Sequence, residues 1–279
     1  MDKVAVTGAT GFLADELIKS LVNTGIHVNA IARNESKLIE LKKKYENISI
    51  FPCPIEDIYL LKKAIKDCSG VYHLASFKDV ILAESHPLKT IQTNIIGTKN
   101  LLQLSTEMSN IGFVISTSTD KAVKISGVYG ASKMIVETLF HECHSINGDK
   151  CKYRLVRYGN VFYSTGSVLV KWKKALLDGD DILLTDDNAT RFFLRKEDAV
   201  SLIFDCLKNA KTPEPCLPIM KSIEMGNLLN VMIKKYGKKD INIKRIGLQK
   251  GENLHELITP ELSSFDAERW TEQDLFEIV

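Results

Sequence analysis

The sequence predicts an α/β fold with a doubly wound parallel sheet and a smaller C-terminal region. Short β-branched runs alternate with longer amphipathic runs through the first half of the chain, which is typical of βαβ units. A glycine-rich turn lies between the first expected strand and the first expected helix. After Asn160 the rhythm becomes less regular. Because parallel crossovers are right-handed, the doubly wound arrangement is the expected one.

The expected elements follow in chain order. The strand candidates are Val4–Val6, His27–Ile31, Ser49–Phe51, Val71–Leu74 and Phe113–Ser116. The helix candidates between them are Phe12–Asn23, Ser36–Tyr45, Ile58–Lys66 and Pro87–Met108. A helix over Val128–Ser145 and a strand over Lys152–Arg157 come next. Turn signals then break up the chain, and Ala199–Lys208 is expected as a helix that packs back on the first half.

Composition excludes several classes of protein. The 279 residues are 44% apolar and 26% charged, which is ordinary for a soluble globular chain and not for a disordered or fibrous one. A net charge of +2 gives no general attraction to nucleic acid or anionic membrane. We expect no signal peptide and no membrane segment. The six cysteines form no CxxC pair, so we expect a reducing cytoplasm and no metal site.

The turn after the first strand has the features of a phosphate loop. Gly8 lets the chain turn tightly, and Gly11 lets the backbone approach a pyrophosphate without a Cβ in the way. The helix that follows presents free N–H groups to the phosphates. The residues expected to bind a dinucleotide here are Thr7, Gly8, Thr10, Gly11, Phe12 and Leu13. The alternative is a plain turn with incidental glycines.

The end of the second strand indicates which dinucleotide is used. An NAD enzyme usually carries an acid there to bind the ribose 2′-hydroxyl. This chain has Arg33, which can pair with a 2′-phosphate, so the sequence favours NADP. The alternative is a surface arginine, with Glu35 serving as the acid. We expect residues 1–160 to form the NADP-binding domain, with 194–212 packing back on it. Residues 161–193 and 213–279 would form the substrate-binding region.

Tyr129 and Lys133 are four residues apart on an expected helix and therefore share one face. A lysine ammonium close to a phenol lowers the phenol pKa toward neutrality, where it can act as an acid or base. The strand before them ends in Ser and Thr residues, of which Thr119 can bind the substrate oxygen that Tyr129 deprotonates.

With these motifs the chain resembles the extended short-chain dehydrogenase/reductase superfamily, which has a Rossmann fold. Further markers are His73-Leu74-Ala75-Ser76 and Asn94. A closer resemblance is to the UDP-N-acetylglucosamine 4,6-dehydratases, especially the inverting type of pseudaminic acid synthesis, and it runs from residue 3 to about 260. Its motifs are Ser118-Thr119-Asp120-Lys121-Ala122, Tyr129-Gly130-Ala131-Ser132-Lys133, Arg157-Tyr158-Gly159-Asn160-Val161, Gly166-Ser167-Val168, Thr190-Arg191-Phe192 and Gly251-Glu252-Asn253-Leu254-His255-Glu256.

The resemblance implies conversion of UDP-N-acetylglucosamine to a 4-keto-6-deoxy sugar nucleotide. The sugar would be oxidised transiently at C4, with Tyr129 as base and Thr119 beside it. Lys121 would remove the C5 proton and return one to the opposite face, and Asp120 would protonate the departing C6 hydroxyl. Without the flanking motifs, the Asp120-Lys121 pair would read as a solvated loop.

The resemblance assigns further residues. Ala75, Tyr129 and Lys133 would contact the cofactor. Asn160 and Arg191 would contact the diphosphate of the substrate. Glu252 and His255 lie in the segment that closes over the substrate, although His255 also fits a simple amphipathic position. Lys78 would lie near the sugar. His73 is expected to pack behind the nicotinamide.

The chain departs from the family pattern at several positions and leaves alternatives open. Pro54 replaces an aspartate that usually binds adenine, and Tyr163-Ser164-Thr165-Gly166 lacks an expected arginine. The alternatives are an NADP-dependent 4-keto-sugar reductase or 4-epimerase, and a non-catalytic NADP-binding sensor or scaffold. By analogy with extended relatives we expect a homo-oligomer, either a dimer or a hexamer, built through Pro87–Met108 and Val128–Ser145.

Overall fold

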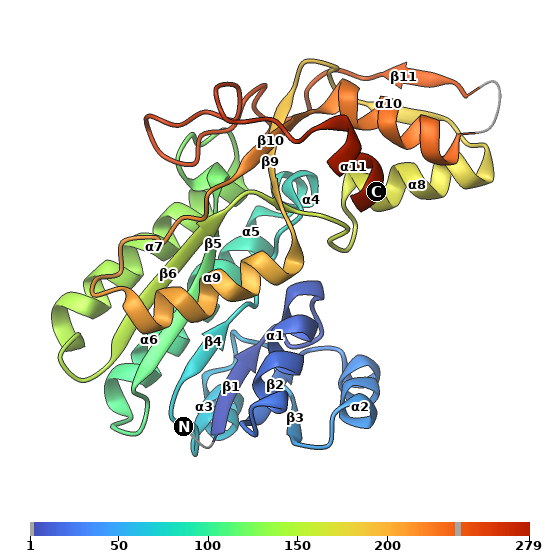
Figure 1. The fold of residues 1–279 in the computed structure, drawn as a ribbon. Coiled ribbons are helices and arrows are strands. Elements are labelled where there is room, and N and C mark those ends of the chain that lie inside the picture. The colour runs from blue at the N-terminus through green and yellow to red at the C-terminus, as the bar shows by residue number, and fades with distance from the viewer. Residues whose placement is uncertain (1–2, 238–240) are drawn as a thin grey trace.

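A computed structural model describes residues 3–237 and 241–279. Six parallel strands form the central sheet in the order β3-β2-β1-β4-β5-β6 (Figure 1). Their bounds are β1 Lys3–Thr7, β2 His27–Ala32, β3 Ile48–Pro52, β4 Val71–His73, β5 Phe113–Thr119 and β6 Lys152–Tyr158. The order places β1 and β4 side by side at the point where the winding reverses. The predicted doubly wound fold is therefore confirmed.

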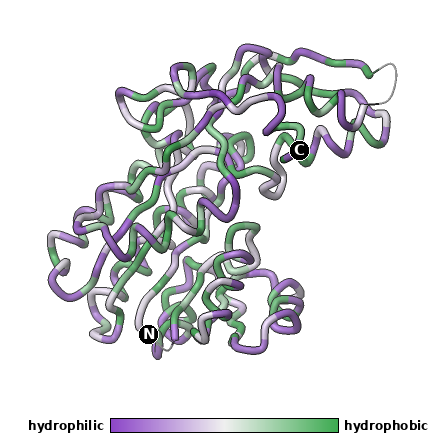
Figure 2. Tube along the Cα trace, in the orientation of Figure 1, coloured by the Kyte–Doolittle hydropathy of each residue, from purple (hydrophilic) through white to green (hydrophobic). Residues whose placement is uncertain are grey.

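Helices cover both faces of this sheet. The side chains of Val4 and Val6 pack with one set of helices, and the side chain of Ala5 packs with the other, as the two-residue period of a strand requires. The first set is α1 Phe12–Asn23, α2 Glu35–Lys44 and α9 Lys196–Asn209. The second set is α3 Ile58–Ile65, α6 Gly97–Glu107 and α7 Val128–Asn147. Figure 2 shows hydrophobic and hydrophilic residues alternating along these helices, as expected for one buried face.

The predicted single helix over Pro87–Met108 is wrong in detail. The chain forms three consecutive pieces over this span: α5 Pro87–Thr90, a π-helical turn η1 Ile91–Ile96, and α6. A short helix, α4 Val80–Ser85, precedes them. The π-helical turn contains Asn94, which is buried and accepts a hydrogen bond of 2.6 Å from the Phe77 amide. The Asn94 amide donates to the Phe77 carbonyl and to Ser132 Oγ. This side chain therefore links the turn to the loop after β4 and to α7.

The second half of the chain is more regular than the sequence predicts. A three-stranded sheet has the order β10-β9-β7, and a two-stranded sheet pairs β8 with β11. The strands are β7 Asn160–Val161, β8 Ile182–Leu184, β9 Thr190–Leu194, β10 Lys221–Glu224 and β11 Ile243–Arg245. Helices α8 Val168–Asp178, α10 Met225–Tyr236 and α11 Glu272–Ile278 pack with them around a third core. The expected helix near residue 199 is α9, which lies against α1 and β6.

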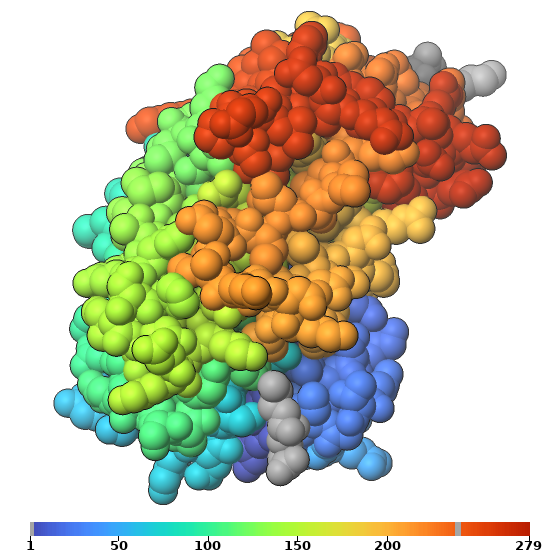
Figure 3. Space-filling view, turned by 60° about the vertical axis from the view of Figure 1, so that its left-hand side comes forward, coloured from blue at the N-terminus to red at the C-terminus, as the bar shows by residue number. Residues whose placement is uncertain are grey.

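The last part of the chain, red in Figure 3, covers the end of the molecule opposite the blue N-terminal elements, whereas the orange part reaches down toward them. Within the described residues, the structure contains no helix with the length and hydropathy needed to cross a membrane.

Candidate active site

A cavity of about 880 Å³ lies where the carboxyl ends of the sheet strands meet the C-terminal region. Strands β1, β2, β4 and β5 all end at this edge, so their following loops converge on it. The cavity brings together sixteen of the predicted site residues. These are Thr7, Gly8, Thr10, Gly11, Phe12, Leu13, Arg33, Ala75, Lys78, Thr119, Lys121, Tyr129, Lys133, Asn160, Arg191 and Glu252. Asp120 and His255 do not line it.

The loop after β1 makes a backbone cradle at one end of the cavity. Gly8 has a φ of +67°, and a Cβ on it would lie 2.8 Å from the Ala75 amide nitrogen. Thr7 Oγ1 accepts a hydrogen bond of 3.2 Å from that amide. Gly11 precedes α1, and no side chain caps the N–H groups of that helix. Backbone surface without Cβ atoms beside open helix N–H groups fits the pyrophosphate of a dinucleotide.

Arg33 lies at the end of β2, where its side chain is exposed and borders the cavity. Asn34 caps α2 by accepting a hydrogen bond from the Lys37 amide. Glu35 begins that helix and does not line the cavity. Pro54 does not line it either, although both of its neighbours do. Glu56 is close enough to interact with the Arg33 charge, but neither Glu35 nor Glu56 lines the cavity.

Tyr129 and Lys133 lie in the first two turns of α7. The Lys133 ammonium donates a hydrogen bond of 2.6 Å to the Thr117 carbonyl. Burial lowers the pKa of Lys133 to about 8, whereas burial raises the pKa of Tyr129 to about 12. The cation that opposes this rise in the Tyr129 pKa is Lys121 and not Lys133, which differs from the prediction. The reason is that Lys133 points to the end of β5.

Asp120 and Lys121 form a short 3₁₀ turn, η2 Asp120–Ala122, directly after β5. Thr119 Oγ1 and Lys121 Nζ donate to the same Asp120 oxygen, over 2.9 and 3.1 Å. A Cβ at Gly130 would lie 2.3 Å from the Lys121 carbonyl, so the glycine lets α7 approach this turn. Burial raises the pKa of Asp120 above its ordinary value despite the neighbouring ammonium. The Lys121 side chain is only 13% exposed, so it lies in the cavity wall and not in bulk water.

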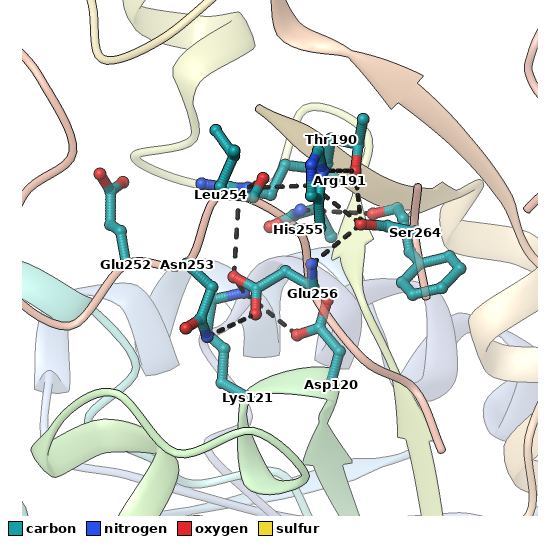
Figure 4. A network of polar contacts seen from close by, with 12 residues as sticks. Asp120, Lys121, Thr190, Arg191, Glu252, Asn253, Leu254, His255, Glu256 and Ser264 are labelled. Carbon is teal, nitrogen blue, oxygen red and sulfur yellow. Dashed lines mark hydrogen bonds and ion pairs between the residues drawn. The ribbon is translucent and has the colours of Figure 1, made fainter. Parts of the chain in front are cut away.

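Sequence reasoning missed Glu256, which lies against Lys121. The Glu256 side chain is buried, and its Oε1 lies 3.4 Å from Lys121 Nζ and 4.0 Å from Arg191 Nε. Figure 4 shows that the carboxylates of Glu256 and Asp120 both lie beside the amine of Lys121. The only sequence signal was an acid at the end of the Gly251–Glu256 motif, since the contact itself depends on the tertiary fold.

Other predicted residues take less direct positions. His255 Nδ1 lies 2.8 Å from Thr190 Oγ1, and the histidine ring packs on Phe265, so this side chain holds the C-terminal segment to β9. Glu252 accepts a hydrogen bond from the Gln249 amide. Lys78 donates to the Thr165 carbonyl over 3.0 Å.

His73 lies beneath the floor of the cavity. Its ring nitrogens contact Thr7 Oγ1 at 2.8 Å and Thr98 Oγ1 at 2.9 Å. Burial, with a smaller effect of Lys133, lowers the pKa of His73 to about 3. The imidazole is therefore neutral and ties β1 to α6.

Comparisons with known proteins agree with this geometry. The model of the polysaccharide biosynthesis protein family matches residues 4–275. A protein of Methanocaldococcus jannaschii, named an uncharacterized membrane protein, is 34% identical over 99% of this chain and 85% of its own length. The UDP-N-acetylglucosamine 4,6-dehydratase (inverting) of Campylobacter jejuni is 30% identical over 91% of this chain and 76% of its own.

Among solved structures, the X-ray structure of Pen from Bacillus thuringiensis superposes with a TM-score of 0.93 and 25% identity, covering 99% of this chain and 97% of that one. The resemblance to extended short-chain dehydrogenase/reductases, and to the inverting dehydratases among them, is thus confirmed. The chain belongs to the polysaccharide biosynthesis protein family, and its relatives include proteins named as a UDP-N-acetylglucosamine 4,6-dehydratase and, in Rickettsia bellii, a UDP-glucose 4-epimerase.

Proposed function

We propose that this chain is an NADP-dependent 4,6-dehydratase that converts UDP-N-acetylglucosamine to a 4-keto-6-deoxy sugar nucleotide with inversion at C5. The observation that carries the proposal is the Asp120–Lys121 pair beside Tyr129 in one cavity. An epimerase or reductase needs the Tyr129 and Lys133 machinery alone, whereas a dehydratase needs a second base and an acid. The Campylobacter relative carries this activity in its name.

The proposed reaction assigns one proton to each residue. Tyr129 takes the proton of the C4 hydroxyl, and Lys133 and Thr119 orient the groups around it. A bound nicotinamide would supply the reversible two-electron oxidation at C4 and reduction at C6. The C4 ketone acidifies the C5 proton, which the neutral Lys121 amine removes. The C6–O bond breaks as Asp120 gives its proton to the departing oxygen, so one water leaves.

The return steps restore all three residues. As C6 is reduced, the Lys121 ammonium gives its proton to the opposite face of C5, which inverts C5 and frees the amine. Tyr129 then still holds the proton of the C4 hydroxyl, and Asp120 lacks the proton that left with the water. Thr119 Oγ1 donates to Asp120 Oδ1 over 2.9 Å and also interacts with Tyr129, so one proton moving from Tyr129 through Thr119 to Asp120 restores the starting state.

NADP is proposed over NAD because of Arg33. Its guanidinium borders the cavity at the end of β2, and the first acid after it, Glu35, does not. A guanidinium there favours a 2′-phosphate, and a carboxylate would favour a free 2′-hydroxyl. In this proposal residues 1–160 and 194–212 hold NADP.

The sugar nucleotide would lie against residues 161–193 and 213–279. Arg191 and Asn160 line the cavity from this side and would contact the diphosphate. Lys78 and Glu252 border the same space and would contact the sugar. His255 would then act only by holding the closing segment on Thr190.

The decisive experiment incubates the protein with NADP⁺ and UDP-N-acetylglucosamine and follows the nucleotide sugar by mass spectrometry. The proposal predicts loss of one water. Lys121→Ala should reduce water loss about 10²- to 10⁴-fold, because a positioned acid or base contributes that much. Lys124→Ala is the matched control, since it removes the same charge from an exposed position nearby.

An unchanged mass would refute the dehydratase. Formation of a C4 epimer, or reduction of a supplied 4-keto sugar, would assign the epimerase or reductase alternative instead. NADP binding without turnover of any nucleotide sugar would assign the sensor or scaffold.

We also propose that the protein works in the cytoplasm as a homo-oligomer, a dimer or hexamer. All six cysteines are free thiols, as a reducing compartment keeps them. Large apolar side chains are exposed on α4, α5 and η1, of which Leu88 is 77% exposed. Analytical ultracentrifugation at several concentrations tests this, and a monomer throughout would refute it.

A further inference from the structure

Lys121 has two carboxylate neighbours, and the proposed reaction uses only one of them. Its ammonium lies 3.1 Å from Asp120 and 3.4 Å from Glu256. Both carboxylates are buried, with exposed side-chain fractions of 0% and 1%. A second buried acid beside the base is costly to fold unless it interacts with a cation, so its position calls for an explanation.

The structure holds the Glu256 carboxylate firmly beside Lys121. Asn253 Nδ2 donates to Glu256 Oε2 over 3.1 Å and also to the Lys124 carbonyl over 3.0 Å. One amide therefore connects the acid to the loop that follows Lys121. The Glu256 backbone amide donates to Ser264 Oγ over 2.9 Å. The acid is thus fixed relative to η2 by contacts that do not involve Lys121 itself.

The remaining oxygen of Glu256 points between two cations. Oε1 accepts no hydrogen bond from the described residues, yet it lies within 4.0 Å of both Lys121 Nζ and Arg191 Nε. Arg191 is anchored separately, because its Nη1 donates to the carbonyls of Thr190 and Leu254. Glu256 therefore interacts with Lys121 mainly through charge.

We propose that Glu256 is a positioning residue for Lys121: its carboxylate keeps the ammonium inside the cavity and controls when the amine is free to take a proton. This inference rests on the proposed function, because it gives the second base of the dehydratase its regulating partner. Glu256 itself need not touch the substrate, since it does not line the cavity.

The sign of the effect follows from the charged and titratable groups that face Lys121 among the described residues. These are Asp120 from η2, Tyr129 from α7, Arg191 from β9 and Glu256 from the C-terminal segment. Burial by itself lowers the pKa of Lys121, but the two carboxylates outweigh burial and raise it, while Arg191 opposes them. Glu256 also raises the pKa of Asp120. Removing the Glu256 charge should therefore lower the pKa of both members of the pair.

The first test is the pH profile of water loss in Glu256→Gln. Because the acid and the base shift together, both limbs of the profile should move to lower pH, whichever residue each limb reports. A unit charge 3.4 Å away shifts a pKa by about one unit even when fully solvated, so a shift of about one pH unit or more is expected. Glu261→Gln is the matched control, because Glu261 is an exposed acid of the same segment.

The second test needs neither substrate nor cofactor. Competitive labelling with acetic anhydride across a pH series, read by peptide mass spectrometry, reports the neutral-amine fraction of Lys121. Its apparent pKa should fall in Glu256→Gln and stay unchanged in Glu261→Gln. Glu256→Asp withdraws the carboxylate by one methylene and should give a smaller shift of the same sign, which also serves if the glutamine variant does not fold.

The outcomes separate this inference from the proposed function. Unshifted profiles and unshifted labelling in the variants would overturn the inference and reduce Glu256 to a structural residue, even if water loss occurs. Conversely, a wild-type protein that releases no water but shows the labelling shift would refute the dehydratase and support the coupling of Glu256 to Lys121.

Discussion

Single buried side chains around the cavity set which groups carry charge. His73, Asp120 and Lys133 are each almost fully buried, and burial is the largest cause of each pKa shift. It favours the neutral form of each group, which is the acid for Asp120 and the base for the other two. The chemistry of this site therefore depends on exclusion of water as much as on residue identity.

His73 should make folding pH-dependent. Its pKa is about 3 in the folded protein and near the ordinary histidine value of 6.5 when unfolded, so the unfolded state binds the proton first as the pH falls. The stabilisation is complete above pH 6.5 and declines progressively below it, by about 2 kcal/mol between pH 7 and pH 5. Urea unfolding of wild type and His73→Gln at both pH values measures this. An equal decrease in the free energy of unfolding between pH 7 and pH 5 in wild type and His73→Gln would contradict this prediction.

Arg33 should determine the choice of dinucleotide. Arg33→Ala removes a charge-assisted contact to a 2′-phosphate, so NADP binding should weaken tenfold or more while NAD binding changes little. Isothermal titration calorimetry with both dinucleotides measures the ratio. Lys37→Ala, an exposed cation one turn into α2, is the control. Equal weakening of both dinucleotides would mean that Arg33 does not read the 2′ position.

At the scale of elements, the junction of β1, its glycine turn and α1 forms the backbone cradle at one end of the cavity. Gly8 allows the loop after β1 to approach the loop after β4, and Thr7 closes that contact from the end of its strand. Each of these residues therefore has its contact because of where it lies relative to the end of β1 and the start of α1. The same principle puts Tyr129 and Lys133 on one face of α7.

Gly8→Ala should abolish dinucleotide binding. The Cβ would meet the Ala75 backbone at 2.8 Å, and a φ of +67° is strained for alanine, so we also expect a loss of about 1–3 kcal/mol in the free energy of unfolding. Gly25→Ala is the control, because Gly25 has a φ of +82° but its Cβ would meet nothing within 4 Å. That variant should show backbone strain while binding the dinucleotide normally. Normal binding by Gly8→Ala would refute the cradle.

At the scale of the whole molecule, one buried ion pair connects three parts of the chain. Glu137 on α7 accepts hydrogen bonds from Ser118 of β5 and from the Arg157 guanidinium of β6. Arg157 also donates to the Ile258 carbonyl over 3.0 Å. Helix α7, the sheet and the C-terminal segment at Ile258 are therefore joined through this pair.

Breaking this pair should destabilise the whole fold. Glu137→Gln leaves the Arg157 charge largely buried without a counterion, so we expect a loss of about 3–5 kcal/mol in the free energy of unfolding. Glu272→Gln breaks the exposed pair with Lys234 and should cost no more than about 1 kcal/mol. If urea titrations gave the same decrease in the free energy of unfolding for both variants, the Glu137–Arg157 pair would stabilise the fold no more than an exposed pair does.

Local pattern predicted the central sheet and the helices of the first half well. The six sheet strands and the helices between β1 and β4 lie within a few residues of their predicted bounds. The division of the helix after Pro87 was missed, because no local signal marks the π-helical turn at Asn94; its partners, Phe77 and Ser132, lie elsewhere in the chain. The helices α8 and α10 were missed because turn signals dominate the sequence around them.

The sequence by itself determined the doubly wound fold, the glycine turn and the spacing of Tyr129 and Lys133, since strand and helix periods act over a few residues. Only the tertiary structure decided that Glu256 and Arg191 meet Lys121, and that Lys133 points to Thr117 and not to the tyrosine. Charge–charge contacts and burial depend on which distant segments pack together, and no local period specifies that packing.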